Sequence, residues 1–357
     1  MGDSTRVIVL LSSLEFRKNF KDISRFVSAS FPGVQLLGAS SEALLGGRRE
    51  IEDGPALVAL AGAFDARSSV DSLYVPPDSS AHAVLQAIDW RDVRGVVALC
   101  DPYSADADKL LEQVREVAPR APVVGGLLLG GEQSGDHALW TEQGVFDEGS
   151  VLLLLRGALR LEPVVSQGAR PVGEPRIVLS RRGHVIDAFD TGKPIDVLRG
   201  ILEEYPRSEW DRLNRAIVLG IGVDEGPFDE GEDFVLGEVI GVDPKTGSMA
   251  VAAVLEDYQV VRFMLREPAV AREDLSRQLT RRSSSDPHSR VGAVLSFVSG
   301  ERGMSFFRSP NHDAQAFAEL VENGAHAGIF CGSEIGPIGK KSVVQSFSAS
   351  AALILED

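Results

Sequence analysis

The residues best suited to chemistry stand together near the end of the chain, where an apolar run leads into Cys-Gly-Ser-Glu-Ile-Gly-Pro. This segment carries a thiol, a hydroxyl, a carboxylate and two glycines: Cys331, Ser333, Glu334, Gly332 and Gly336. A thiol is a potential nucleophile, and the hydroxyl and carboxylate can hydrogen-bond a polar ligand. The glycines let backbone N–H groups approach that ligand closely. The pattern therefore predicts a functional loop at the end of a strand.

Two earlier segments have the same pattern, a short apolar run that ends in small residues. Ser40 and Ser41 belong to the first, Gly-Ala-Ser-Ser, and Gly125 and Gly126 open the second, Gly-Gly-Leu-Leu-Leu-Gly-Gly. In open α/β sheets, ligands bind beside the carboxyl ends of the strands, where such loops lie. Three equivalent loops would line one binding site. The alternative is that each is a tight structural turn.

Cys331 admits two interpretations. As a nucleophile it would need a base, for which His312 and His326 are candidates, and loop N–H groups would form an oxyanion hole. As a structural residue it would pack like a small hydrophobic side chain. The sequence has no phosphate-binding loop, no nucleophile elbow and no histidine or cysteine pairs at metal-ligand spacing. We therefore expect no metal and no cofactor.

Arg302 lies in a glycine-containing segment, between Gly300-Glu and Gly303. The planar guanidinium can pair both oxygens of a ligand carboxylate, whereas the alternative is a surface salt bridge. His312 is expected near the start of a helix and is also a candidate ligand contact. The hypothesis is that Arg302 binds a carboxylate while side chains of the glycine loops, among them Ser40 and Glu334, supply hydrogen bonds.

The elements that must position these residues recur three times, each time as a strand, an amphipathic helix, a second strand and a glycine loop. The predicted copies are residues 6–11, 16–27 and 34–37, then 96–100, 106–117 and 122–124, then 291–298, 311–322 and 327–330. Between the second and third copies, residues 159–265 read mainly as strands and hairpins, with a helix at 195–205. These patterns predict an α/β fold with mixed sheets in a layered sandwich.

Composition narrows the class of protein. The 357 residues carry a net charge of −16, which disfavours nucleic acid or an anionic membrane as the main partner. We find no apolar run of about 18 residues and no secretory signal pattern. Cys100 and Cys331 are too few for a disulfide framework. We expect a cytoplasmic protein.

Several motifs occur in a recognisable order. They are Gly38-Ala-Ser-Ser, Gly125-Gly-Leu, Thr191-Gly-Lys-Pro, Gly300-Glu-Arg-Gly, Pro310-Asn-His-Asp, the segment 327–337 and Phe347-Ser-Ala-Ser. In these motifs, and in residues 235–265, the chain resembles the FIST family, a two-part sensory domain. In two places it departs from the family pattern: Ser299 stands where a cysteine is usual, and Gln345 lies where a histidine is often found.

The resemblance implies a FIST N-like domain over residues 1–190 and a FIST C-like domain over residues 191–357. It also implies a small-molecule sensor, with amino acids proposed as ligands, that signals through a downstream partner protein, and no established catalysis. Two other hypotheses stay open. One is a hydrolase or transferase that depends on Cys331, and the other is a protein-interaction scaffold whose glycine loops are structural.

Overall fold

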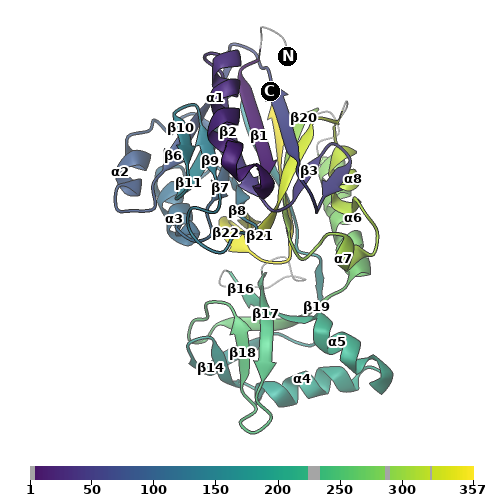
Figure 1. Cartoon of the computed structure of the whole chain (residues 1–357). Coiled ribbons are helices and arrows are strands. Elements are labelled where there is room, and N and C mark those ends of the chain that lie inside the picture. Colours follow the sequence, from purple (N-terminus) through teal and green to yellow (C-terminus); the bar gives the residue numbers. More distant parts are fainter. Residues whose placement is uncertain (1–4, 224–233, 286–289, 322–323) are drawn as a thin grey trace. The chain divides into compact units, whose positions relative to one another are not determined.

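The computed structural model describes residues 5–223, 234–285, 290–321 and 324–357 (Figure 1). The chain forms two compact units. The first contains Met1–Ser166, Ser276–Pro337 and Lys341–Asp357, and the second contains Gln167–Leu275 and Ile338–Lys340. All three predicted repeats therefore belong to the first unit, and the region between the second and third repeats makes most of the second.

Each repeat is a parallel pair of strands joined by helical structure. The copies are β1 (Val7–Ser13), α1 (Phe20–Ser30) and β2 (Gln35–Ser41); β7 (Val93–Cys100), α3 (Ala107–Val117) and β8 (Val123–Leu128); and β20 (Val291–Ser299), α7 (Met304–Phe307), α8 (His312–Ala318) and β21 (His326–Ile338). Helix α3 begins where predicted, because the Asp106 side chain accepts a hydrogen bond from the Lys109 N–H. The repeat of strand, helix and strand is confirmed.

The structure differs from the prediction at the three glycine segments, which lie mostly inside strands. Gly38-Ala-Ser-Ser ends β2, Gly125 and Gly126 lie within β8, and Cys331–Pro337 is part of β21. Pairing with other strands makes these segments strands: β21 runs antiparallel to β8, with Ile335 opposite Gly125, while β2 pairs with β1 and β9. Such long-range pairing leaves no signal in the local sequence.

Two sheets form the first unit. The smaller has the order β10-β9-β2-β1-β5, in which the new strands are β10 (Gly144–Phe146), β9 (Leu139–Thr141) and β5 (Leu57–Gly62). The larger sheet has the order β12-β23-β20-β21-β8-β7-β11-β6. Its strands outside the repeats are β12 (Leu159–Ser166), β23 (Ala349–Glu356), β11 (Ser150–Gly157) and β6 (Ser68–Val75). Two short strands, β22 (Lys341–Gln345) and β3 (Leu44–Gly46), also pair with β21, and β4 (Arg49–Ile51) pairs with β3.

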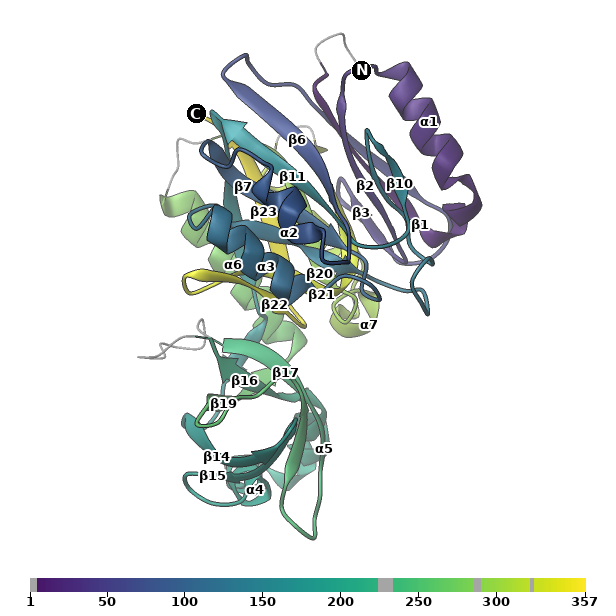
Figure 2. The same ribbon diagram turned by 90° about the vertical axis from the view of Figure 1, so that its left-hand side faces the viewer.

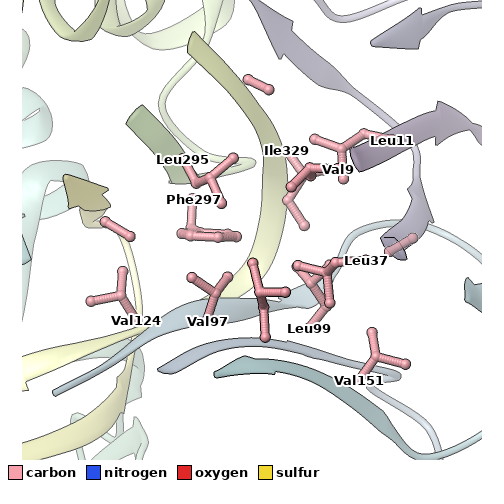
Figure 3. Close-up of a cluster of buried hydrophobic side chains, with 14 of the residues drawn as sticks. Val9, Leu11, Leu37, Val97, Leu99, Val124, Val151, Leu295, Phe297 and Ile329 are labelled. Carbon is pink, nitrogen blue, oxygen red and sulfur yellow. The ribbon is translucent and has the colours of Figure 1, made fainter. Parts of the chain in front are cut away.

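The main core lies between these sheets. Leu11 and Leu37 of the smaller sheet pack with Val97, Leu295 and Ile329 of the larger one (Figure 3). Helix α1 covers the outer face of the smaller sheet, and α3 and α2 (Ala81–Gln86) cover the larger (Figure 2). The order helix, sheet, sheet, helix confirms the predicted layered α/β sandwich.

The second unit contains a barrel-like sheet of six strands. They are β19 (Val260–Arg266), β14 (Arg176–Arg182), β15 (Val185–Phe189), β18 (Met249–Ala252), β17 (Phe234–Val242) and β16 (Ile217–Gly222). The ring closes because β16 pairs with both β17 and β19, while β13 (Ala169–Pro171) pairs with β19 outside it. Helices α4 (Pro194–Glu203) and α5 (Trp210–Ala216) pack onto its core through Ile201, Leu202 and Leu213.

Helix α6 (Pro268–Ser285) joins the second unit back to the first and is 18 residues long. Its buried residues are Ala271, Asp274 and Leu275, and the Asp274 carboxylate accepts a hydrogen bond from the Gly168 N–H at 2.9 Å. Across the residues that the structure describes, no helix combines the length and the apolar composition needed to span a membrane.

Candidate functional site

Strand β21 joins the two halves of the larger sheet. Its first half runs parallel to β20 and its second half antiparallel to β8, with a shift of register between Cys331 and Ser333. Gly332 lies at this bulge and is exposed, and Ser333 is half-buried. The bulge adds one residue to β21, which bends the strand and redirects the side chains that follow. Glu334, the next residue, is fully buried.

The ends of the three repeats meet at β21. The Ser41 hydroxyl donates to the Phe330 carbonyl at 2.7 Å and accepts from the Leu129 N–H at 3.1 Å. Ser40 is also buried, and its Oγ accepts from the Ala138 N–H at 2.8 Å. Both hydroxyls are therefore engaged by the backbone, and they hold strand ends together in this structure.

Gly125 and Gly126 allow close packing between strands. A Cβ atom on Gly125 would lie 1.8 Å from the carbonyl oxygen of Ala98 in β7, and one on Gly126 would lie 2.3 Å from Cys331 Sγ. Both glycines are buried, and neither has a positive φ. They are required by steric contact with neighbouring strands.

Cys331 is packed against this glycine surface and is fully buried. Burial raises the pKa of its thiol well above the usual range, and the nearby carboxylate of Glu334 raises it further. His326 Nδ1 contacts the Gly47 carbonyl at 2.6 Å and its Nε2 contacts Ser296 Oγ at 2.7 Å, while His312 contacts Asp313. A thiol in this environment stays protonated at neutral pH, which disfavours Cys331 as a nucleophile.

Arg302 is also fully buried and pairs with Asp313 rather than with solvent. Its Nε lies 2.7 Å from Asp313 Oδ2 and its Nη2 lies 3.0 Å from Oδ1, a bidentate geometry. The guanidinium carbon lies 5.2 Å from the ring centre of Phe307, on which the His312 ring is stacked at 3.8 Å. The carboxylate that Arg302 binds here belongs to the protein itself.

Asp313 has a pKa set by opposing effects. Burial alone would raise it, but the charge of Arg302 and hydrogen bonds from Arg302 and His312 lower it to about 2. Its backbone N–H donates at 2.7 Å to Glu50 Oε1, which also accepts from the Ala314 N–H at 3.1 Å. Strand β4 is thereby linked to the first turn of α8.

A pH dependence follows from this shift. The pKa of Asp313 is lower in the folded protein than the usual 3.8. The ionised carboxylate therefore stabilises the folded state fully above pH 3.8, and this contribution is lost as the pH falls toward 2. Asp313→Asn should therefore be much less stable than wild type at pH 6, and the difference should shrink as the pH drops from 4 to 2. Urea denaturation of both proteins across this range measures it. A difference independent of pH would contradict the assignment.

Four buried polar side chains surround the end of β21, and we call them the β21 polar cluster: Glu334, Gln345, Ser348 and Ser350. Glu334 Oε2 accepts from the Ser348 N–H at 2.9 Å and from its hydroxyl at 2.7 Å. Gln345 ends β22 and is 2% exposed, and Ser350 in β23 is 0% exposed. Within the described residues, neither the Gln345 amide atoms nor Ser350 Oγ have a hydrogen-bond partner.

The predicted site residues thus fall into separate groups. Glu334 and Gly336 belong to the cluster region, Arg302 and His312 surround Asp313, and the remaining predicted residues make strand contacts or lie at the bulge. Reasoning from the sequence missed Gln345, Ser348 and Ser350 as candidate functional residues. Their signal was the polar stretch Gln-Ser-Phe-Ser-Ala-Ser, where serines two apart share one face of a strand.

A second buried polar group was also missed, at the end of β7. His137 Nδ1 lies 3.1 Å from Asp101 Oδ1 and its Nε2 lies 3.2 Å from the Leu129 carbonyl. The Tyr103 hydroxyl donates to the Gly131 carbonyl at 2.8 Å. These contacts fix the segment after β8. Among the described residues, no group of three His, Cys, Asp or Glu side chains is arranged to hold a metal ion.

Family models match nearly the whole chain. The FIST N domain matches residues 6–191 and the FIST C domain matches residues 194–337. The chain belongs to the FIST family. FIST domains are associated with sensory roles in signal transduction, and the family is not known as one of enzymes.

The names of three relatives of this FIST protein state no ligand. An uncharacterized protein of Mycobacterium bovis is 33% identical, with 100% of this chain and 92% of the relative covered. An uncharacterized protein of Mycobacterium tuberculosis is 32% identical, with 99% of this chain and 92% of the relative covered. An F-box/LRR-repeat protein of Arabidopsis thaliana is 29% identical over 45% of this chain and 31% of its own length.

Proposed function

We propose that this FIST protein is a cytoplasmic sensor that binds a small polar metabolite, such as an amino acid or another small polar compound, at the β21 polar cluster. The observation that carries the proposal is the pair Gln345 and Ser350, which are buried without hydrogen-bond partners among the described residues. Leaving a buried polar group unpaired costs about 1–3 kcal/mol. A ligand that pairs with these groups recovers that cost and so binds favourably.

The location of the cluster supports a sensory role. Its members lie on β21, on β23 and at or near the end of β22, and β21 pairs with strands of two different repeats. Ser348 extends the connection, because its carbonyl accepts from the Ser299 N–H at 3.0 Å at the end of β20. A ligand bound here would contact the strand that joins the sheet and would favour one arrangement of these strand ends.

In this proposal the other predicted residues have supporting roles. Glu334 and Ser348 hold the cluster together, and Arg302 holds the adjoining segment through Asp313. The signal would pass to a partner protein. The Arabidopsis relative, named an F-box/LRR-repeat protein, matches this chain over only 31% of its length, which fits a FIST region that works with other protein modules.

A thermal-shift screen tests the proposal. Amino acids, small carboxylates and small amides are added to the full chain, and a ligand present at about 100 times its Kd should add about 2.7 kcal/mol of stability. The shift should vanish in Gln345→Leu and persist in the matched control Gln143→Leu, whose side chain is exposed. Unchanged melting curves with every compound would contradict the proposal, as would a shift that Gln345→Leu retains.

A further inference from the structure

We infer that Gln345 and Ser350 form a subsite for a neutral carboxamide group and select it over a carboxylate. The inference rests on the proposed function, because it assigns the chemical class that the same cluster would recognise. The sequence predicts a ligand carboxylate at Arg302, but the Arg302 guanidinium pairs with Asp313 in this structure. The inference therefore assigns a carboxamide, rather than a carboxylate, to the cluster.

The two side chains converge on Gly336. A Cβ atom at this glycine would lie 2.8 Å from Ser350 Oγ and 3.0 Å from Gln345 Nε2, with Val165 Cγ2 on a third side at 2.8 Å. Because Gly336 has no side chain, the Gln345 amide, the Ser350 hydroxyl and a Val165 methyl group pack directly against this glycine. Pro337, Ser346 and Phe347, which adjoin this group in the sequence, are only partly buried.

The hydrogen-bonding capacity of this pair matches a carboxamide. Gln345 offers two N–H donors and a carbonyl acceptor, and Ser350 offers one donor and acceptor lone pairs. A ligand carboxamide also presents N–H donors beside a carbonyl, so it can pair with both atoms of the Gln345 amide at once. The match does not depend on which way the glutamine amide is turned, because a half-turn only exchanges its donor and acceptor ends.

A ligand carboxylate fits the same groups poorly. It accepts hydrogen bonds but donates none, so the Gln345 carbonyl would stay unpaired and buried. It would also bring a full charge to two neutral residues, and burial of a charge without a counter-charge is costly. Glu334, two residues before Gly336 on β21, has the same sign as the ligand would have. The guanidinium of Arg302, the predicted carboxylate-binding group, is paired with the carboxylate of Asp313.

Matched amide and acid pairs test the inference on the full chain at pH 7. The probes are nicotinamide against nicotinate, L-glutamine against L-glutamate, and L-asparagine against L-aspartate, with affinity measured by isothermal titration calorimetry. Within at least one pair the amide should bind about tenfold more tightly or better, the effect of one or two hydrogen bonds. Gln345→Leu and Ser350→Ala should each weaken the binding of the amide probe by about tenfold, while Gln143→Leu should leave its affinity unchanged.

The results separate this inference from the proposed function. Binding of an acid with equal or greater affinity than its amide, in every pair that binds, would overturn the carboxamide subsite and leave the sensor proposal standing. Amide binding that survives both Gln345→Leu and Ser350→Ala, in proteins whose circular dichroism matches wild type, would also overturn it. If wild type binds none of the six probes, the carboxamide subsite is overturned, while binding of other compounds in the thermal-shift screen still decides the sensor proposal.

Discussion

Replacing Arg302 with alanine is expected to lower the free energy of unfolding of the first unit by about 3–5 kcal/mol. Arg302 and Asp313 are 0% and 1% exposed, and two hydrogen bonds join them. Removing one partner leaves the other as an uncompensated buried charge, which is the costly case. Urea denaturation followed by the fluorescence of Trp90 and Trp140 measures the change in the first unit.

A double substitution separates the ion pair from the packing around it. The double variant Arg302→Met with Asp313→Leu removes both charges. It should therefore be less destabilising than Arg302→Ala, even though it changes two residues instead of one. Arg25→Ala is the matched control, since Arg25 and Asp22 form an exposed pair in the first unit with side chains 78% and 74% accessible, and it should change stability by about 0.5 kcal/mol or less. A loss below about 1 kcal/mol in Arg302→Ala would show that the buried pair is not formed.

Substitution of Gly125 or Gly126 by alanine is expected to have the second large effect. At Gly126 the added methyl group meets the Cys331 side chain, and such overpacking costs about 1–3 kcal/mol. At Gly125 it meets the backbone of Ala98 in the paired strand β7. A backbone atom held in a sheet cannot move aside, so Gly125→Ala should destabilise the first unit more than Gly126→Ala does.

A second-site substitution tests the cause. Cys331→Ala removes the sulfur that Gly126→Ala would strike, so the double variant should recover part of the lost stability, whereas Cys331→Ala should not rescue Gly125→Ala. Gly200→Ala is the control, because Gly200 lies within α4 and an added Cβ atom would have no neighbour within 4 Å, so the change should stabilise the second unit by about 0.5–1 kcal/mol. Equal effects at Gly125 and Gly200 would contradict the packing argument.

The helices and most strands were predictable from local patterns. The apolar spacing of α3 and its cap at Asp106 lie within twelve consecutive residues, and the helix predicted at 195–205 is α4, Pro194–Glu203. The glycine segments were misread because a run of small residues suits either a loop or a tightly packed strand. What decided between them was contact across the fold, such as Ala98 against Gly125.

The candidate site was predicted only in part, because contacts between distant segments are again not visible in the local sequence. Arg302 and Glu334 were identified by residue type and by their glycine-rich surroundings. Their partners Asp313 and Ser348 lie 11 and 14 residues away in the chain, and only folding shows that they meet. Gln345 and Ser350 looked like ordinary polar residues of a strand region until the structure placed them in the interior.

The sequence by itself determined the repeat of strand, helix and strand, the layered α/β class and the family, because periodicity and ordered motifs are local properties of a chain. Only the tertiary structure decided that Cys331 is a packing residue, that Arg302 binds a carboxylate of the protein, and that Gln345 and Ser350 converge on Gly336. These properties depend on burial and on pairs of atoms from distant segments. For Cys331 these contacts depend on how β21 pairs with strands of different repeats on either side of Gly332.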